Sequence, residues 1–408
     1  MIIKYLGVVT LLLASIQAHT EEQALQKYLE KLEEHPQVTQ ILEQSYKLKE
    51  LSISEMGLPD PQLILGVDNV PVNSPKFDRF LPTSKTIGFK QQIPSYSLRK
   101  AKAGKQVMLS KRQQLMAEYT QKRLKAILLS ELSELDKVKK LEKLAKKQLG
   151  YYKLMEDDLK GQLEAGQPVY GRFSEIDVER TEIEQYLNGL KAERVSIEEE
   201  LIFLVGEVPH LELPALPDVA WHREQASLYP VAIASESVNA ASKGTDAALA
   251  AFKPNYGIQA LYKQRESGST YSGDDWFSVQ ATVSIPLWYK KNQKPKLRAA
   301  QAEKRSAEFA YDETARYWVK RMSELKAERE VAQDNIALLK GKRASLQEMV
   351  EAANRNYESG NAPLESVLDA QIDELTIASQ LAKQRSRYAR LSAEFNSHII
   401  ERSYNENN

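Results

Sequence analysis

The side chains that most often bind metals or act as nucleophiles form no reactive group in this chain. It has no cysteine, which excludes disulfides, thiolate metal sites and a cysteine nucleophile. Neither the seven methionines nor the histidines cluster, and no nucleophile elbow or phosphate-binding loop is present. The five histidines, none at metal-ligand spacing, are His19, His35, His210, His222 and His398. The sequence therefore predicts no enzyme, no resident metal and no cofactor.

The charge of the chain is balanced. Lys and Arg total 56, and Asp and Glu also total 56. No net field therefore attracts nucleic acid or an anionic surface to the whole molecule. We expect no nucleic-acid partner.

The first eighteen residues have the pattern of an export signal. Lys4 precedes an apolar run from Leu6 to Ile16, and Ala18 has the small side chain expected at a cleavage site. A membrane-spanning helix needs about 20 apolar residues, and no stretch of the chain reaches that length. We therefore expect export, and any membrane crossing to be made by strands. An exported, disulfide-free chain of long helices indicates a Gram-negative periplasm or outer membrane.

The chain repeats one plan twice. Each copy has a helix, two strands that end in Ile-Pro, and two long helices joined at a glycine-bearing turn. The two Ile-Pro pairs, at Ile93 and Ile285, are 192 residues apart, which indicates duplication. The predicted parts are a signal peptide at 1–18, a first repeat at 19–207 (β-hairpin about 61–95, coiled-coil hairpin about 98–205), a Pro-rich linker at 208–222, a second repeat at 223–402 (β-hairpin about 254–288, coiled-coil hairpin about 295–402) and a polar tail at 403–408.

The predicted strands alternate apolar with polar residues, as a sheet with one lipid-facing side requires. A soluble sheet with one wet face would have the same pattern. The clearest apolar face is that of the last strand: Phe277, Val279, Ala281, Val283, Ile285 and Leu287.

Apolar residues at steps of three and four predict long helices. One covers Leu98–Leu149, about 78 Å if straight, and its counterpart runs from about Pro295 to Tyr357. A first helix is predicted over Glu22–Met56, where Gly57 and the prolines that follow end it.

Four strands cannot close a barrel in lipid, because the two edge strands would keep unpaired backbone groups. Known bacterial barrels have at least about 8 strands, and an eight-stranded interior is filled by side chains. Three copies, which give twelve strands, are the smallest number that leaves a passage. The predicted fold is mainly α with a small β part, built from the duplicated helix, β-hairpin, helix unit.

The order of these elements resembles the TolC family of outer-membrane efflux proteins. The resemblance covers nearly everything from His19 onward and includes both Ile-Pro strand ends and the phrase Glu365-Ser366-Val367-Leu368-Asp369-Ala370. It implies a homotrimer with a 12-stranded outer-membrane β-barrel, continued by a long α-helical barrel in the periplasm. It also implies a passive conduit that contacts outer-membrane lipid and is opened by a periplasmic adaptor and an inner-membrane pump.

Three segments resemble one branch of that family. Gly57–Leu63, Asp68–Val72 and Gln91–Pro94 are similar to the channels paired with RND pumps for heavy-metal cations. Two alternatives stay open: a multidrug or protein-exporting channel of the same family, and a protein of another class. The latter would be a periplasmic adaptor, with one helical hairpin between compact β-domains, or a secreted coiled-coil scaffold.

The resemblance also implies a periplasmic gate. By position, Asp369 matches a constricting aspartate, while Ser366, with Glu365 beside it, occupies the other acidic position. Three ionised copies of Asp369 near one axis would repel one another and favour cations. An ordinary solvated acid near a helix start would have the same sequence pattern.

A latch between the inner and outer coils is implied as well. Tyr357 and Asp177 match residues that link the coils in the family, whereas the expected arginine partner falls on Ala362. The glycine-bearing turns would be the tips that contact the adaptor, although glycine alone can simply end a helix. The tip residues are Gly166, Gln167, Gly360 and Asn361.

Aromatic residues flank the last predicted strand. Trp276, Trp288 and Tyr289 lie where an aromatic belt would meet the membrane interfaces. Ordinary packing is the alternative.

Overall fold

A computed structural model describes residues 24–211 and 216–400. The predicted signal peptide and polar tail lie outside these residues. The described chain forms two compact units, and each draws segments from both repeats. We call them the strand unit (40–116 and 230–316) and the helical unit (residues up to 39, 117–229, and those from 317).

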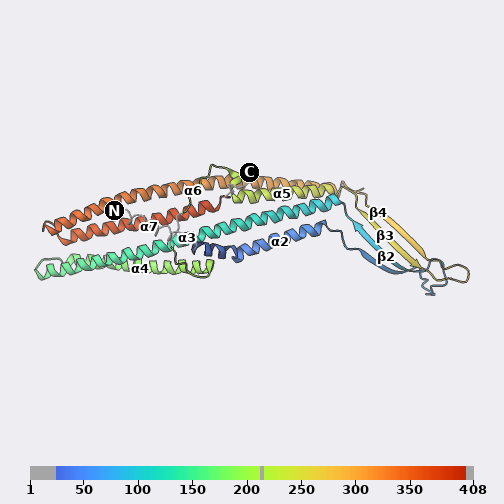
Figure 1. Cartoon of the computed structure of the whole chain (residues 1–408), viewed down its shortest axis with the longest axis horizontal. Coiled ribbons are helices and arrows are strands. Elements are labelled where there is room, and N and C mark those ends of the chain that lie inside the picture. The colour runs from blue at the N-terminus through green and yellow to red at the C-terminus, as the bar shows by residue number, and fades with distance from the viewer. Residues whose placement is uncertain (1–23, 212–215, 401–408) are drawn as a thin grey trace, which may run out of the picture. The chain divides into compact units, whose positions relative to one another are not determined.

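The strand unit contains one antiparallel sheet with the strand order β1-β2-β3-β4 (Figure 1). The pairing of β2 with β3 joins the hairpins of the two repeats. Within the described chain, β1 and β4 each have one paired side, so the sheet has two open edges. The strands are β1 (Gln62–Asp68), β2 (Ser84–Ile93), β3 (Tyr256–Gln264) and β4 (Trp276–Val283).

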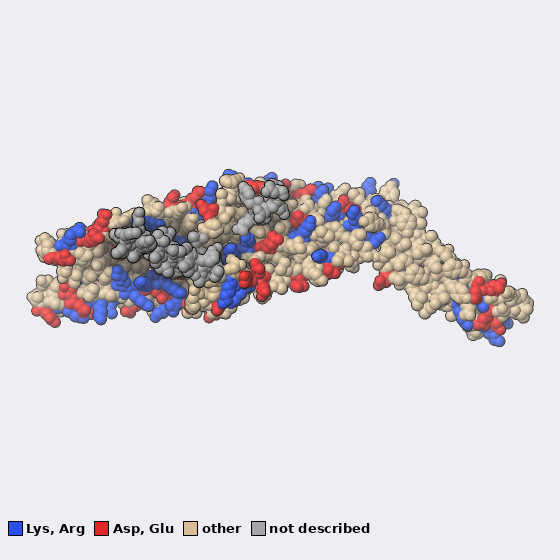
Figure 2. All heavy atoms as spheres, viewed as in Figure 1, with Lys and Arg blue, Asp and Glu red and all other residues tan. Residues whose placement is uncertain are grey.

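The register confirms the predicted alternation. Phe89 pairs with Leu63 on one side and Ala260 on the other, and Ala260 pairs with Val279, so these apolar residues form one row across the sheet. The apolar face is open to solvent in the single chain: Leu65 is 70% exposed and Val279 58%. The strand surface in Figure 2 is accordingly almost free of charge until the loops at its far end.

The opposite face carries polar contacts. Asp68 accepts hydrogen bonds from Thr86 Oγ1 at 2.7 Å and from Lys263 Nζ at 2.7 Å, which ties β1, β2 and β3 together. Gly88 lies on this face, and an added Cβ would come within 2.8 Å of the Ala260 carbonyl oxygen. A side chain at Gly88 would therefore force the central strands apart.

The last strand is shorter than predicted. β4 ends at Val283, whereas the alternating pattern continues to Leu287. Pro286 has no N–H to donate to a neighbouring strand, and Leu287 instead bonds the Ile285 carbonyl at 2.8 Å. The apolar face nevertheless continues past the strand, because Ile285 is 69% exposed.

Small residues bring the helices of the strand unit close together. Ser45 of α2 (Pro36–Met56) and Ser110 of α3 (Tyr96–Glu164) each donate a hydroxyl to the other's carbonyl at 3.0 Å. Thr245 of α5 (Tyr229–Ala250) bonds the Ala300 carbonyl of α6 (Gln293–Glu358) at 3.3 Å. The packing thus pairs α2 with α3 and α5 with α6.

The predicted first helix is broken. Residues 24–33 are helical, the helix stops at 34–35, and α2 begins at Pro36. Proline lacks the N–H that a continuous helix needs but suits the first helical position. His35 caps the new helix, since its Nδ1 accepts from the Gln37 N–H at 3.3 Å and its carbonyl from the Thr39 N–H at 3.0 Å.

The helical unit consists mainly of two antiparallel hairpins, the end of α3 with α4 (Tyr170–Val205) and α6 with α7 (Leu364–Ser397) (Figure 1). The predicted leucine stripe of α3 is confirmed as buried, with Leu128 and Val138 both 0% exposed. The helix extends beyond the Leu98–Leu149 stretch and ends at the predicted glycine-bearing turn. α3 continues to Glu164 because Tyr152, Met155 and Leu159 prolong the buried stripe past Gly150.

The Pro-rich linker packs on the helical unit. Arg329 of α6 bonds Asp218 Oδ1 at 2.9 Å and lies 4.5 Å from the ring centre of Phe395. The Asn396 side chain donates to the Pro217 carbonyl at 2.9 Å. A short 3-10 helix, η1 (Gln225–Ser227), then leads into α5. None of the described helices has the length and apolar character needed to cross a membrane.

His398 lies buried under aromatic rings in the helical unit. It is 6% exposed, its ring centre is 4.4 Å from that of Trp318, and its Nδ1 is 2.7 Å from the Tyr119 hydroxyl. Burial lowers the pKa of His398 to about 4; Glu394 opposes this shift, and Arg123 and Arg321 add to it. The folded protein therefore holds this histidine neutral at pH values where an unfolded chain would protonate it.

Acid should therefore weaken the helical unit through His398. The unfolded side chain binds a proton below about pH 6.5, so the free energy of unfolding should fall by about 3 kcal/mol as the pH decreases from 6.5 to 4. Thermal unfolding followed by circular dichroism across this range checks the effect. His398→Gln should remove part of the dependence on pH, and the exposed His222→Gln should leave it unchanged. Equal pH dependence in the wild type and His398→Gln would contradict the assignment.

Candidate gate at the tips of the helical hairpins

The two tips have the same turn geometry. Gly166 and Gly360 adopt positive φ angles of 83° and 73°, and the same pair of hydrogen bonds closes each helix end. Gly166 N–H bonds Leu163 O at 2.9 Å and Gln167 N–H bonds Gln162 O at 3.1 Å; the matching bonds at the second tip are both 2.9 Å. This is the Schellman ending, which explains why both repeats carry glycine there. The four predicted tip residues are exposed.

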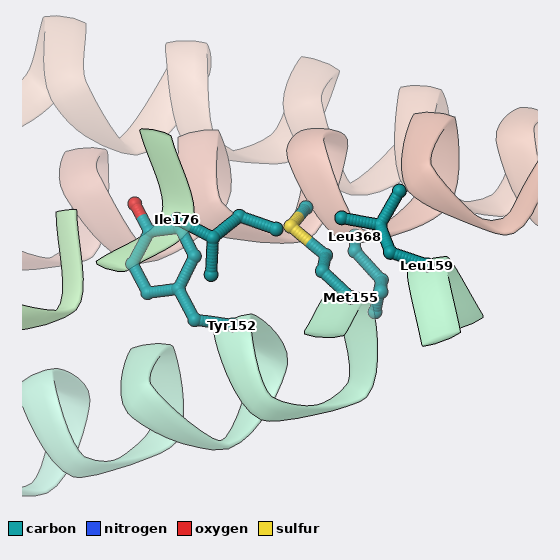
Figure 3. Packing of buried hydrophobic residues seen from close by; sticks show 5 residues of the cluster. All are labelled: Tyr152, Met155, Leu159, Ile176 and Leu368. Atoms are coloured by element: carbon teal, nitrogen blue, oxygen red, sulfur yellow. The ribbon is translucent and has the colours of Figure 1, made fainter. Parts of the chain in front are cut away.

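An apolar cluster joins the two hairpins just behind the tips. Figure 3 shows Tyr152, Met155 and Leu159 of α3 meeting Ile176 of α4 and Leu368 of α7. All five are buried, so the first two turns of α4 and α7 are held against the same stretch of α3. The Gln148 side chain donates to the Tyr152 hydroxyl at 3.2 Å, and burial raises the pKa of that tyrosine.

Arg172 connects the first turns of α4 and α7. Its Nε lies 2.7 Å from Glu365 Oε1, and its Nη1 lies 2.8 Å from Glu175 Oε2. Its Nη2 is 3.9 Å from Asp369 Oδ1. The hydrogen bonds that the Arg172 guanidinium donates to Glu175 and Glu365 raise its pKa, so it stays charged. This arginine thus bridges the two hairpins of one chain.

The three predicted gate residues lie together at the start of α7. Glu365 occupies the first helical turn, where the helix dipole favours a negative charge, and Ser366 is exposed beside it. The Asp369 side chain is 55% exposed. Its partial burial and Glu365 raise the pKa of Asp369, and Arg172 opposes them. The carboxyl group of Asp369 is therefore protonated more readily than that of a free aspartate.

The two predicted latch residues are not joined within one chain. Tyr357 lies in the last turn of α6 and is 45% exposed, and Asp177 lies on α4. Across residues 24–211 and 216–400 no hydrogen bond links their side chains, so this pairing stays a prediction. The ion pair of Arg172 with Glu365, which does link the hairpins, was missed because the matched arginine position, Ala362, lacks the charge.

The predicted interface aromatics are exposed at the two ends of β4. Trp276 begins the strand, and the Arg265 guanidinium carbon lies 4.0 Å from the centre of its indole ring. Trp288 is 73% exposed, and Tyr289 packs on Phe252 with ring centres 6.4 Å apart. Their place at a membrane boundary remains a prediction. Among the described residues, no group of three or more His, Asp or Glu side chains has a metal-binding arrangement.

A family model matches much of the second half of the chain. The model described as outer membrane efflux protein matches residues 231–395, from α5 through the second hairpin and most of α7. Over these residues, less than half of the chain, the sequence is similar to the outer membrane efflux proteins. The match confirms the suspected family resemblance, the predicted outer-membrane localisation with a periplasmic helical part, and an efflux-channel role. No curated protein matches the chain.

Solved structures show the same fold for the whole efflux protein. The outer membrane protein VceC from Vibrio cholerae aligns with a TM-score of 0.74 at 15% identity, over 94% of this chain and 98% of that one. CusC aligns with a TM-score of 0.74 at 14% identity, over 92% of each chain. The MtrE outer membrane channel of Neisseria gonorrhoeae, solved in an open state, aligns with a TM-score of 0.74 at 14% identity, over 91% of this chain and 88% of that one. The predicted fold class is thereby confirmed.

Proposed function

We propose that this chain is one third of a passive exit channel in the outer membrane of a Gram-negative cell. The observation that carries the proposal is the four-stranded sheet with an exposed apolar face and two open edges. Lipid would cover that face, and β4 of one copy would pair with β1 of the next. Three copies close a barrel of twelve strands, the smallest with a passage.

The helical hairpins form the periplasmic end of this channel. The two exposed tips, with equal turn geometry, supply six similar contact points in a trimer for a periplasmic adaptor. An inner-membrane pump of the RND class would supply the energy, as the resemblance to the heavy-metal branch implies. The domain division into two repeats and a linker is proposed together with this assembly.

The gate is proposed at the start of α7. Three copies of Asp369 near the channel axis would bind passing cations and would repel one another when ionised. Arg172 and Glu365 would hold α7 against α4 in the closed state, in the role that the resemblance assigns to a pair involving the position of Ala362. The charges are exchanged here, since the arginine lies on α4 and the acid on α7.

The proposed cargo is heavy-metal cations. The support is the resemblance of Gly57–Leu63, Asp68–Val72 and Gln91–Pro94 to the heavy-metal branch. A conduit needs no resident metal site, because ions leave through it without being stored. The competing cargo is drugs or proteins, exported through the same architecture.

A deletion strain separates these cargoes. Loss of the gene should lower tolerance to copper, silver, zinc, cobalt or cadmium, and a plasmid copy should restore it. Unchanged metal tolerance with lost drug tolerance would replace the metal proposal by the multidrug one. A heat-labile trimer in the outer-membrane fraction checks the channel itself and would exclude a periplasmic adaptor or a secreted scaffold.

A further inference from the structure

Three connections between strands and helices meet at one end of the sheet, in the strand unit. Asn255, just before β3, accepts a hydrogen bond from the Ser95 N–H at its Oδ1, at 2.9 Å. Its own N–H donates to Ser284 Oγ at 2.8 Å, and its carbonyl accepts from the Ser284 N–H at 2.8 Å. Asn255 thus fixes the segments that follow β2, precede β3 and follow β4 beside one another.

These connections and the helix starts beside them carry exposed cations. We call the set the basic collar: Lys100, Lys253, Lys290, Lys291, Lys294, Lys296 and Arg298. No acidic residue occurs from Trp276 to Ala302 or from Ser84 to Ala117 in the sequence. The described chain offers the collar no ion pair. Glu55 and Glu303 instead pair with Lys102 and Lys105, at 3.4 Å each.

The collar adjoins the exposed apolar surface of the sheet. Leu287 is 68% exposed and Trp288 73%, and the lysines begin two residues later. The Trp288 carbonyl accepts from the Lys291 N–H at 3.0 Å, and the Tyr289 carbonyl from the Lys294 N–H at 2.8 Å. These backbone bonds fold the segment into a turn, so that its lysines follow the aromatic residues within a short span. Figure 2 shows Lys and Arg gathered where the uncharged strand surface meets the helices.

We propose that the basic collar binds the phosphate groups of anionic phospholipids in the leaflet that faces the periplasm. This inference rests on the proposed function, which places the apolar face in lipid. An apolar band that ends in aromatic rings and then in unpaired cations matches, in that order, acyl chains, the interface and anionic headgroups. Long lysine side chains reach the headgroups while their methylene stems stay on apolar surface.

The collar is a local property that the net charge conceals. The chain as a whole is neutral, so no long-range field draws it to an anionic surface. Cations held at the membrane boundary act within about 10 Å, the screening distance at 0.1 M salt. The collar would therefore set the depth and the lipid neighbours of a channel already inserted, without being needed for insertion.

Lipid binding to the purified full-length trimer tests the inference. Trp288 lies beside the collar, so bromine-labelled phosphatidylglycerol in mixed vesicles should quench its fluorescence more than bromine-labelled phosphatidylcholine does. The variant Lys290→Gln/Lys291→Gln/Lys294→Gln/Lys296→Gln should lose about tenfold or more of this preference. The matched control Lys139→Gln/Lys140→Gln/Lys143→Gln/Lys146→Gln removes four exposed lysines from α3 and should keep it.

The other outcomes are equally decisive. A collar variant with unchanged preference would overturn the inference, and so would full displacement of the lipid by inorganic phosphate, which would indicate a site for the free anion. If the variant fails to fold, the wild-type trimer still tests the inference. A preference for phosphatidylglycerol that does not decrease as the salt concentration rises would also overturn it. Insertion into pure phosphatidylcholine vesicles reports on the proposed function separately, since the collar is not needed there.

Discussion

Arg172→Glu should open the periplasmic end of the channel. The substitution replaces the bridge from Arg172 to Glu365 by a repulsive pair of carboxylates and also brings a like charge near Glu175. A partly exposed pair contributes up to about 1 kcal/mol, so three chains shift the closed-to-open equilibrium by about 3 kcal/mol, or about 100-fold. Single-channel conductance in planar bilayers should rise accordingly, and cells should become sensitive to large antibiotics.

Two controls connect this effect to the link between hairpins. Arg172→Glu combined with Glu365→Arg restores opposite charges at the same two positions and should return the conductance toward the wild-type value. Arg180→Glu breaks a 2.9 Å pair with Glu156 that lies inside one hairpin, so it should leave the conductance unchanged. A folded Arg172→Glu trimer with wild-type conductance would remove Arg172 from the gate.

Val279→Lys should prevent assembly in the outer membrane. Val279 lies on the exposed apolar face of β4, in one row with Ala260 and Phe89. A lysine facing lipid near the membrane centre costs about 2–4 kcal/mol per chain, and a trimer would bear this cost three times. Membrane fractionation should show loss of the heat-labile trimer band.

The neighbouring residue supplies the matched control. Gln280 points to the opposite face of the same strand, so Gln280→Lys places the same charge on the side that would face water in the proposed barrel. This variant should assemble normally and conduct cations less well. Equal assembly of the Val279 and Gln280 variants would show that the apolar face is not in lipid.

The spacing of apolar residues and the residue types at turns determined which parts of the fold could be predicted from the sequence. The alternation of Phe277 and Val279 with polar residues gave the correct face, because a strand has a period of two wherever it lies. Gly166 and Gly360 marked the helix ends since only the left-handed conformation permits that turn. The break at His35 was missed because apolar residues continue at helical spacing on both sides of it, whereas Pro36 lacks the N–H that a continuous helix needs.

The charged contacts of the site could not be predicted in the same way. Arg172 and Glu365 are 193 residues apart, and no local pattern places the start of α4 beside the start of α7. Burial of Leu368 against Met155 and Ile176 fixes that placement, and it depends on tertiary packing. The sequence therefore predicted the glycine turns at the tips and the acidic start of α7 beside them, whereas only the fold identified the contact of Arg172 with that acidic start.

The central position of β2 and β3 has a consequence for how a ring of subunits could grow. Within one chain the two repeats are already joined, because β2 of the first hairpin pairs with β3 of the second over nine residue pairs. The open edges are β1 and β4, the outer strands of those hairpins. Every pairing between subunits would therefore join β4, from the second repeat of one chain, to β1, from the first repeat of the next. Each subunit would thus contribute a sheet that is already assembled, and one kind of strand pairing, repeated between subunits, would close the proposed barrel.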